Sequence, residues 1–173
     1  DLIRSGAALD EGMIYFDARL SVRFPTVEIR VADVCTEVAD AVLIAALCRG
    51  MVLTAAQRRR RGDRPTEWPA PWQRAATWRA ARYGLTDGLL DWTTRQVVPA
   101  RAAVASLVAD LRDSLEETGD LELVTEGIDR MLRSGTGAER QRAAYRATGS
   151  LAAVVDDAVR RTIEPPAGHQ DAR

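Results

Sequence analysis

The stretch YFDARLSVRFPTVEIRVADV, residues 15–34, alternates apolar and polar side chains along two short runs. Side chains of a strand point to opposite faces with a period of two, so this alternation predicts a β-hairpin. The segment Phe24-Pro25-Thr26 predicts the turn, because proline cannot donate to a central ladder. One face of the hairpin is then apolar. The other face carries five polar side chains, which are Tyr15, Asp17, Arg19, Glu28 and Arg30.

Two interpretations of this polar face are open. Many antiparallel sheets have one solvated face, on which opposite charges pair across the strands. This hairpin, however, is the one strong β pattern in a chain whose other patterns are helical. Helices should therefore cover much of the sheet, and the polar face is expected to line a cavity.

The remaining patterns predict an α+β fold, in which an antiparallel β-hairpin from a larger antiparallel sheet is covered by five or six α-helices. The helix after the hairpin is expected to be capped by Thr36 and to continue to about residue 57. Its run Ala41–Leu47 is apolar all round and predicts a fully buried helix. Further helices are expected over 72–83, from Pro99 up to Gly119, over 121–132 and over 151–163, the last capped by Ser150. Short strands are expected at 89–90 and 96–98, and residues 164–173 are expected to be a disordered tail.

Composition limits the classes of function. The chain has 24 basic and 25 acidic residues, so no overall charge favours nucleic acid or a membrane. It contains no lysine, and its single histidine, His169, lies in the polar tail, which argues against a Schiff base, a histidine triad or a histidine-rich zinc site. No apolar run is expected to reach transmembrane length, and nothing resembles a signal peptide. Cys35 and Cys48 would lie roughly 20 Å apart along a helix, which predicts free thiols in a reducing cytoplasm.

Three basic segments each have a structural and a functional interpretation. Arg58–Arg61 is either a polyanion patch or a set of cations at a helix end, and the second is favoured because no aromatic residues interleave them. Arg79 and Arg82 share a helix face, which is either a plain exposed surface beside a buried Trp78 or a contact to substrate.

The third basic segment begins with Gly135-Thr136-Gly137 and contains Arg140. Its backbone amides could bind an anion together with Arg140. Alternatively, Gly135 ends one helix and Thr136 begins the next.

Three motifs, YFDARLS…FPTVEIRVADVCT, WRAARYGL and GTGAERQRAAYR, together resemble the C-terminal half of bacterial carboxylate–amine ligases, the second glutamate–cysteine ligase family. The resemblance runs from about Gly12 to about Arg161. It implies a glutamine-synthetase-like fold and an ATP- and Mg²⁺-dependent enzyme that joins a carboxylate to an amine through an acyl phosphate. Leu20 departs from the family, which often has proline there.

The resemblance also assigns roles. Glu28 corresponds to a metal ligand at the ATP site and Arg30 to a phosphate-binding arginine. Asp17 is expected to orient Arg19 or to accept a proton from the amine. The expected substrate-binding residues are Tyr15, Arg19, Arg82 and Arg140.

One glutamate cannot hold a cluster of magnesium ions, so the missing ligands imply a partner. We expect an N-terminal half, or a second chain, to complete both sheet and site, and the completed enzyme to be a cytoplasmic homo-oligomer. Residues 1–163 would then be the C-terminal half of a single catalytic domain. With Asp1 in first place, the sequence is expected to be a fragment or a cleavage product. The rival hypotheses are a non-catalytic scaffold subunit of the same fold and, weaker, a helical nucleic-acid-binding protein. The acid and the amine are not specified.

Overall fold

The computed structural model describes residues 2–13 and 16–163, and it confirms the α+β class. Within these residues there are six α-helices and two two-stranded antiparallel sheets. The chain divides into two compact units, Asp1–Val34 and Cys35–Arg173. Tyr15 and the expected tail, residues 164–173, lie outside the described residues.

The first unit contains a 3₁₀ helix, η1 (Glu11–Met13), and the predicted hairpin, formed by β1 (Ala18–Leu20) and β2 (Val27–Ile29). The register pairs Arg19 with Glu28 and Leu20 with Val27. Directly opposite residues share a face of the sheet, so the predicted separation of polar and apolar faces is confirmed.

Two expectations for the hairpin need correction. The strands are three residues each, shorter than the alternation suggested, and a loop closed by the Ser21 N–H to the Thr26 carbonyl (2.9 Å) joins them. Helices were expected to cover much of the sheet, but Leu20 and Val27, on its apolar face, are 76% and 41% exposed. Within the described residues this sheet gains no third strand, and a two-stranded hairpin has little interior to cover.

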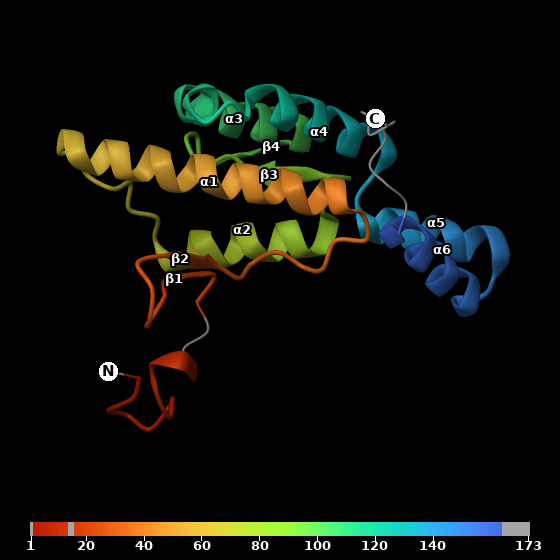
Figure 1. Ribbon diagram of the computed structural model, residues 1–173, viewed down its shortest axis with the longest axis horizontal. Coiled ribbons are helices and arrows are strands. Elements are labelled where there is room, and N and C mark those ends of the chain that lie inside the picture. The colour runs from red at the N-terminus through yellow and green to blue at the C-terminus, as the bar shows by residue number, and fades with distance from the viewer. Residues whose placement is uncertain (1, 14–15, 164–173) are drawn as a thin grey trace, which may run out of the picture. The chain divides into compact units, whose positions relative to one another are not determined.

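The second unit is mainly helical (Figure 1). Its elements, in chain order, are α1 (Val38–Arg61), α2 (Ala70–Tyr83), β3 (Gly88–Leu90), β4 (Val97–Pro99), α3 (Ala100–Glu117), α4 (Leu121–Ser134), α5 (Gly137–Thr148) and α6 (Leu151–Ile163). The two short strands predicted between the helices form an antiparallel hairpin, β3–β4, against which α2 and α3 pack.

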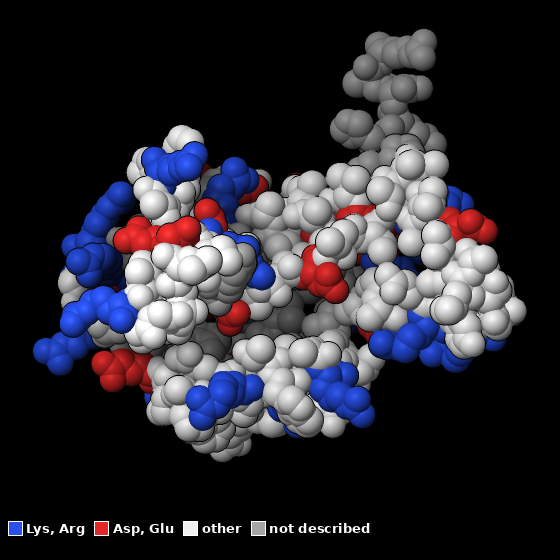
Figure 2. Space-filling model, turned by 90° about the horizontal axis from the view of Figure 1, so that it is seen from below, with Lys and Arg blue, Asp and Glu red and all other residues white. Residues whose placement is uncertain are grey.

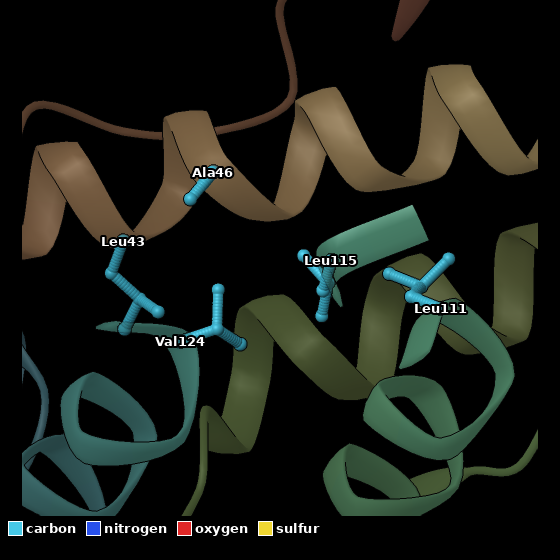
Figure 3. Close-up of a cluster of buried hydrophobic side chains, with 5 residues drawn as sticks. All are labelled: Leu43, Ala46, Leu111, Leu115 and Val124. Carbon is cyan, nitrogen blue, oxygen red and sulfur yellow. The ribbon is translucent and has the colours of Figure 1, made fainter. Parts of the chain in front are cut away.

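The core of this unit lies where α1 crosses α3 and α4 (Figure 3). Leu43 and Ala46 come from α1, Leu111 and Leu115 from α3, and Val124 from α4. Gly50 permits the close approach of α1 to α3, because a Cβ there would lie 2.9 Å from Leu115 Cδ2. Fully burying one such leucine stabilises the fold by about 1.5–3 kcal/mol.

Helix α1 differs from its prediction in two ways. Thr36 is not the cap, since Glu37 occupies the N-cap position and Val38 begins the helix. The helix is not buried all round either: its buried positions follow one stripe only, Asp40, Leu43, Ala46, Gly50 and Thr54. The helix also continues past residue 57 to Arg61, so that the four arginines occupy its last turn, where cations are favourable to the helix dipole.

The expectation that no apolar run reaches transmembrane length is wrong for α1. By length and composition this helix could cross a membrane, because an 18-residue window within it has a mean hydropathy of 1.8. Only 28% of that window is buried. The core helix of a soluble protein passes the same test, and one face of α1 does pack in the core described above.

Charged side chains hold α5 and α6 to the start of α1. Arg140 on α5 lies 2.6 Å from Asp40 (Nη2 to Oδ2), and Arg161 on α6 lies 2.9 Å from Glu37 (Nη1 to Oε1). Arg130 on α4 completes the group, 2.8 Å from the other Asp40 oxygen. Figure 1 shows α5 and α6 as a helical hairpin beside the first turns of α1.

The free energy of unfolding should depend on pH through the ionisation of Asp40. Burial alone raises the pKa of this carboxyl, but hydrogen bonds from Arg130 and Arg140 outweigh burial and hold the pKa below 3.8. The ionised form therefore stabilises the fold above about pH 4, and this contribution is lost as the pH falls through the folded pKa. We expect Asp40→Asn to lower the free energy of unfolding at pH 7 and to flatten its decline between about pH 5 and pH 2 in urea titrations. The exposed Asp113→Asn is the matched control and should follow the wild type; an equally steep decline in Asp40→Asn would contradict this role.

Candidate functional site

Glu28 lies between two arginines on the polar face of the first unit's hairpin. Arg19 Nε donates to Glu28 Oε2 at 2.8 Å, and Arg30 Nη1 lies 3.7 Å from the same oxygen. The strand register sets this arrangement, because Arg19 and Glu28 are direct cross-strand partners. Two of the predicted site residues, Arg19 and Arg30, are thus brought together around the Glu28 carboxylate.

Arg19 is held mainly by contacts within the first unit. Its Nη1 donates to the backbone carbonyls of Gly12 (3.0 Å) and Glu11 (3.3 Å), and its side chain is only 16% exposed. The guanidinium therefore connects η1 to the hairpin. This bracing role accounts for its burial without any substrate.

Arg30 and Asp17 lie one step beyond the paired strands. The Arg30 N–H donates to the Asp17 carbonyl at 2.8 Å, which extends the pairing and puts both residues on the polar face. Asp17 is exposed, and its carboxylate makes no hydrogen bond or ion pair with another described residue. The Arg30 side chain is 35% exposed, so both groups are accessible for chemistry.

Glu28 suits a role as one ligand of a magnesium–nucleotide complex. Both of its ion pairs use Oε2, and no described residue bonds to Oε1, while the side chain is 39% exposed. Mg²⁺ is usually held by one or two carboxylates together with phosphate oxygens, and guanidinium groups match phosphate oxygens in geometry. Residues 2–13 and 16–163 contain no group of three or more His, Cys, Asp or Glu that could hold a metal. Among these residues, Glu28 therefore fits as a single ligand and not as part of a complete metal site.

The two arginines of the WRAARYGL motif have different surroundings in the second unit. Arg79 Nε donates to the Gly88 carbonyl at 3.0 Å, and its guanidinium stacks over Tyr83 at 5.2 Å from the ring centroid. Arg82 is exposed and has no hydrogen-bond or ion-pair partner among the described residues. Trp78 does not lie in the core as one interpretation required, since it is 59% exposed. Of the two arginines, Arg82 is the one whose guanidinium is available to a ligand.

Arg140 is buried, and both of its Nη atoms donate to groups of the protein. Besides Asp40, it donates through Nη1 to the Gly135 carbonyl at 2.7 Å, and its side chain is 5% exposed. The helix start beside it is closed by a capping box: the Thr136 N–H donates to Glu139 Oε2 (2.8 Å), and the Glu139 N–H donates to Thr136 Oγ1 (3.4 Å). The structural interpretation, in which Gly135 ends one helix and Thr136 begins the next, is therefore confirmed.

Sequence reasoning missed Asp40 and Glu37, the acidic partners of Arg140 and Arg161. Their place at the start of a helix has a simpler explanation, because acidic residues there are favourable to the helix dipole. The available signal was position: Asp40 is three residues before Leu43, on the stripe that meets α4. A carboxylate there requires cationic partners, because an unpaired buried charge is costly.

The Arg58–Arg61 run contributes to a helix end and to the wall of a cavity. Arg58 pairs with Asp110 (2.5 Å) and lies over the Trp92 ring at 5.9 Å. A cavity of about 640 Å³ opens there, with Arg59, Arg64 and Leu111 in its lining. Figure 2 shows basic and acidic side chains interspersed with uncharged surface on the face in view. Nothing in this arrangement adds support to the nucleic-acid hypothesis.

Comparison with known proteins agrees with the resemblance of the three motifs. The sequence model of glutamate–cysteine ligase family 2 (GCS2) matches residues 1–157. The chain belongs to this family. This membership assigns the chain to a family of ligases. The pairing of Glu28 with two arginines is therefore found in a member of a ligase family.

The relatives are longer proteins. A Streptomyces coelicolor protein named "Putative glutamate–cysteine ligase 2" is 49% identical over 162 residues, which are 94% of this chain and 45% of the relative. A Frankia alni protein of the same kind is also 49% identical, over 93% of this chain and 42% of its own length. A Frankia casuarinae protein is 40% identical over 97% of this chain and 20% of the relative. The GCS2 chain described here thus spans less than half of each. No solved structure matches it.

Proposed function

We propose that this GCS2 chain supplies part of the active site of an ATP-dependent carboxylate–amine ligase. The observation that carries the proposal is the position of Glu28 between Arg19 and Arg30 on an accessible sheet face, in a member of a ligase family. Glu28 would contribute one oxygen to the magnesium ion that accompanies ATP. Arg30 would hold an oxygen of the γ-phosphate, whose charge increases during transfer.

The proposed reaction has two steps. A carboxylate oxygen of the acid attacks the γ-phosphorus, the bond to the bridging oxygen breaks, and ADP leaves with that bonding pair. The amine nitrogen then attacks the acyl carbon, the carbon–oxygen bond to phosphate breaks, and inorganic phosphate is released. Asp17, exposed on the same face, would accept the proton that the amine loses. The remaining ligands would come from the portion of the family's length that this chain does not span.

The test is a chimera in which this chain replaces the matched segment of the Streptomyces coelicolor relative. Magnesium-dependent phosphate release is measured over a panel of acids and amines that begins with glutamate and cysteine, and products are identified by mass spectrometry. The proposal predicts an amide product formed together with ADP. A folded chimera that forms no amide, beside an active relative, would contradict the proposal and favour a non-catalytic subunit.

In the chimera, Arg30→Lys should lower turnover by about tenfold or more, because an ammonium cannot reproduce the planar two-pronged guanidinium. Arg23→Lys, in the exposed loop of the same hairpin, is the control and should leave turnover unchanged. A loss below about threefold at Arg30, or 0.7 kcal/mol, would reduce Arg30 to a structural charge.

A further inference from the structure

The face of α1 opposite the core is apolar and exposed. Val38, Val42 and Val52 are 50%, 45% and 40% exposed, and the exposed Ala41 and Ala45 lie between them. These five residues recur at helical spacing along about 21 Å of the helix. We call them the outer face of α1.

One charged side chain, which is 59% exposed, interrupts the outer face. Arg49 lies within it, but its Nε donates to Asp120 Oδ2 at 2.8 Å, in the connection from α3 to α4. The small side chains of Ala41 and Ala45 let another backbone approach closely. An exposed apolar surface of this kind marks a protein or membrane contact.

The length of the relatives suggests which partner covers the outer face of α1. The chain spans 45% and 42% of two relatives that are 49% identical to it, so more than half of each lies outside the match. We propose that the outer face of α1 is the docking surface for the portion of the family's catalytic domain that this chain does not span. The partner surface is expected to be an uncharged apolar strip of similar length.

A membrane fits these observations less well. The opposite face of α1 is committed to α3 and α4 through Leu43 and Ala46 and through a buried hydrogen bond between Thr54 Oγ1 and Ser114 Oγ (2.7 Å). Asp40 near the start of the helix is buried in ion pairs. Insertion of α1 alone would break these contacts and bring a charge into the bilayer, which is costly.

Helix α6 offers a second exposed apolar stripe, formed by Leu151, Val155, Val159 and Ile163. The family model ends at residue 157, within this stripe, but relatives align with this chain over 162 to 169 residues. The α6 stripe serves as the control surface, because it is also apolar and is more exposed than the outer face of α1.

The experiment co-expresses the tagged 173-residue chain with the unmatched part of the Streptomyces coelicolor relative as a separate polypeptide. Affinity purification and size-exclusion chromatography should give a 1:1 complex. Ala45→Glu/Val52→Glu should reduce the co-eluting fraction by about tenfold or more, because each carboxylate would lose its water in the contact beside Arg49, which is already paired with Asp120. Val155→Glu/Val159→Glu should leave it unchanged. Circular dichroism of each free chain shows whether the variants fold.

A second measurement does not depend on the charged variants. Alkylation of Ala45→Cys, followed by mass spectrometry of its peptide, should be about tenfold slower in the complex than in the free chain. Equal alkylation rates, or equal loss of binding in the α1 and α6 variants, would overturn the proposal. Two other results would also overturn it. One is flotation of the wild-type chain with phosphatidylcholine–phosphatidylglycerol vesicles that only the α1 variant abolishes. The other is self-association of the wild-type chain that only the α1 variant abolishes. This proposal rests on the proposed function in one respect: both assume that a further portion of the family's length completes this chain. Binding of that portion, however, is measured without ATP. A complex that turns over no ATP would therefore contradict only the proposed function.

Discussion

Replacing Glu28 by glutamine should lower magnesium-dependent ATP turnover of the chimera by about a hundredfold or more, the effect of losing a group that stabilises transition-state charge. The amide keeps the size of the side chain and can still accept a hydrogen bond from Arg19. It removes the negative charge that a magnesium ligand provides and that faces two guanidinium groups. The measurement is phosphate release as a function of magnesium concentration, with the thermal unfolding midpoint recorded for each variant.

The control for this change is Glu11→Gln, in the same unit. Glu11 contacts Arg19 through its backbone carbonyl, which the substitution retains. Turnover should therefore remain close to that of the unmodified chimera. Normal turnover in Glu28→Gln with an unchanged unfolding midpoint would remove Glu28 from the metal site.

Arg140→Met should have the largest effect on stability. The substitution leaves Asp40 buried with Arg130 as its remaining strong partner and removes the cation beside Glu37. Breaking a buried ion pair from one side costs about 3 kcal/mol or more. We expect the free energy of unfolding, measured in urea at pH 7, to fall by about that amount.

The exposed Arg142, two residues further along α5, provides the matched control. Arg142→Met should change the free energy of unfolding by less than about 0.5 kcal/mol. If Arg140→Met were as stable as Arg142→Met and instead raised the KM for the acid in the chimera, the substrate-binding role inferred from the family resemblance would be correct and the structural role wrong.

Local patterns were sufficient to predict the hairpin and much of its polar face. A period of two fixes which side chains share a face of a strand. The alternation around Arg19 and Glu28 therefore predicts that these two side chains lie on the same face of the hairpin. The same reasoning located β3 and β4 and the helix boundary at Gly135. These features depend on residues close together in the sequence.

Features that depend on distant residues were not predictable in this way. Only one face of α1 is buried because α3 and α4 cross that face. The residues of α3 and α4 that share the core with Leu43 lie more than 60 positions further along the sequence. The occupation of Arg140 by Asp40 joins residues 100 positions apart. Composition alone could not distinguish an arginine that binds a substrate from one that compensates a buried carboxylate.

The most direct test of the account follows oxygen from the acid into phosphate. The acid that supports turnover by the chimera is labelled with ¹⁸O in its carboxylate, and the released phosphate is analysed by mass spectrometry. Because the attacking carboxylate oxygen stays with phosphorus when the carbon–oxygen bond breaks, the account predicts one ¹⁸O atom in each phosphate and one amide formed per ADP. Unlabelled phosphate released at the same rate would show that ATP is hydrolysed without acyl-phosphate formation, and would contradict the assignment of this chain to a carboxylate–amine ligase site.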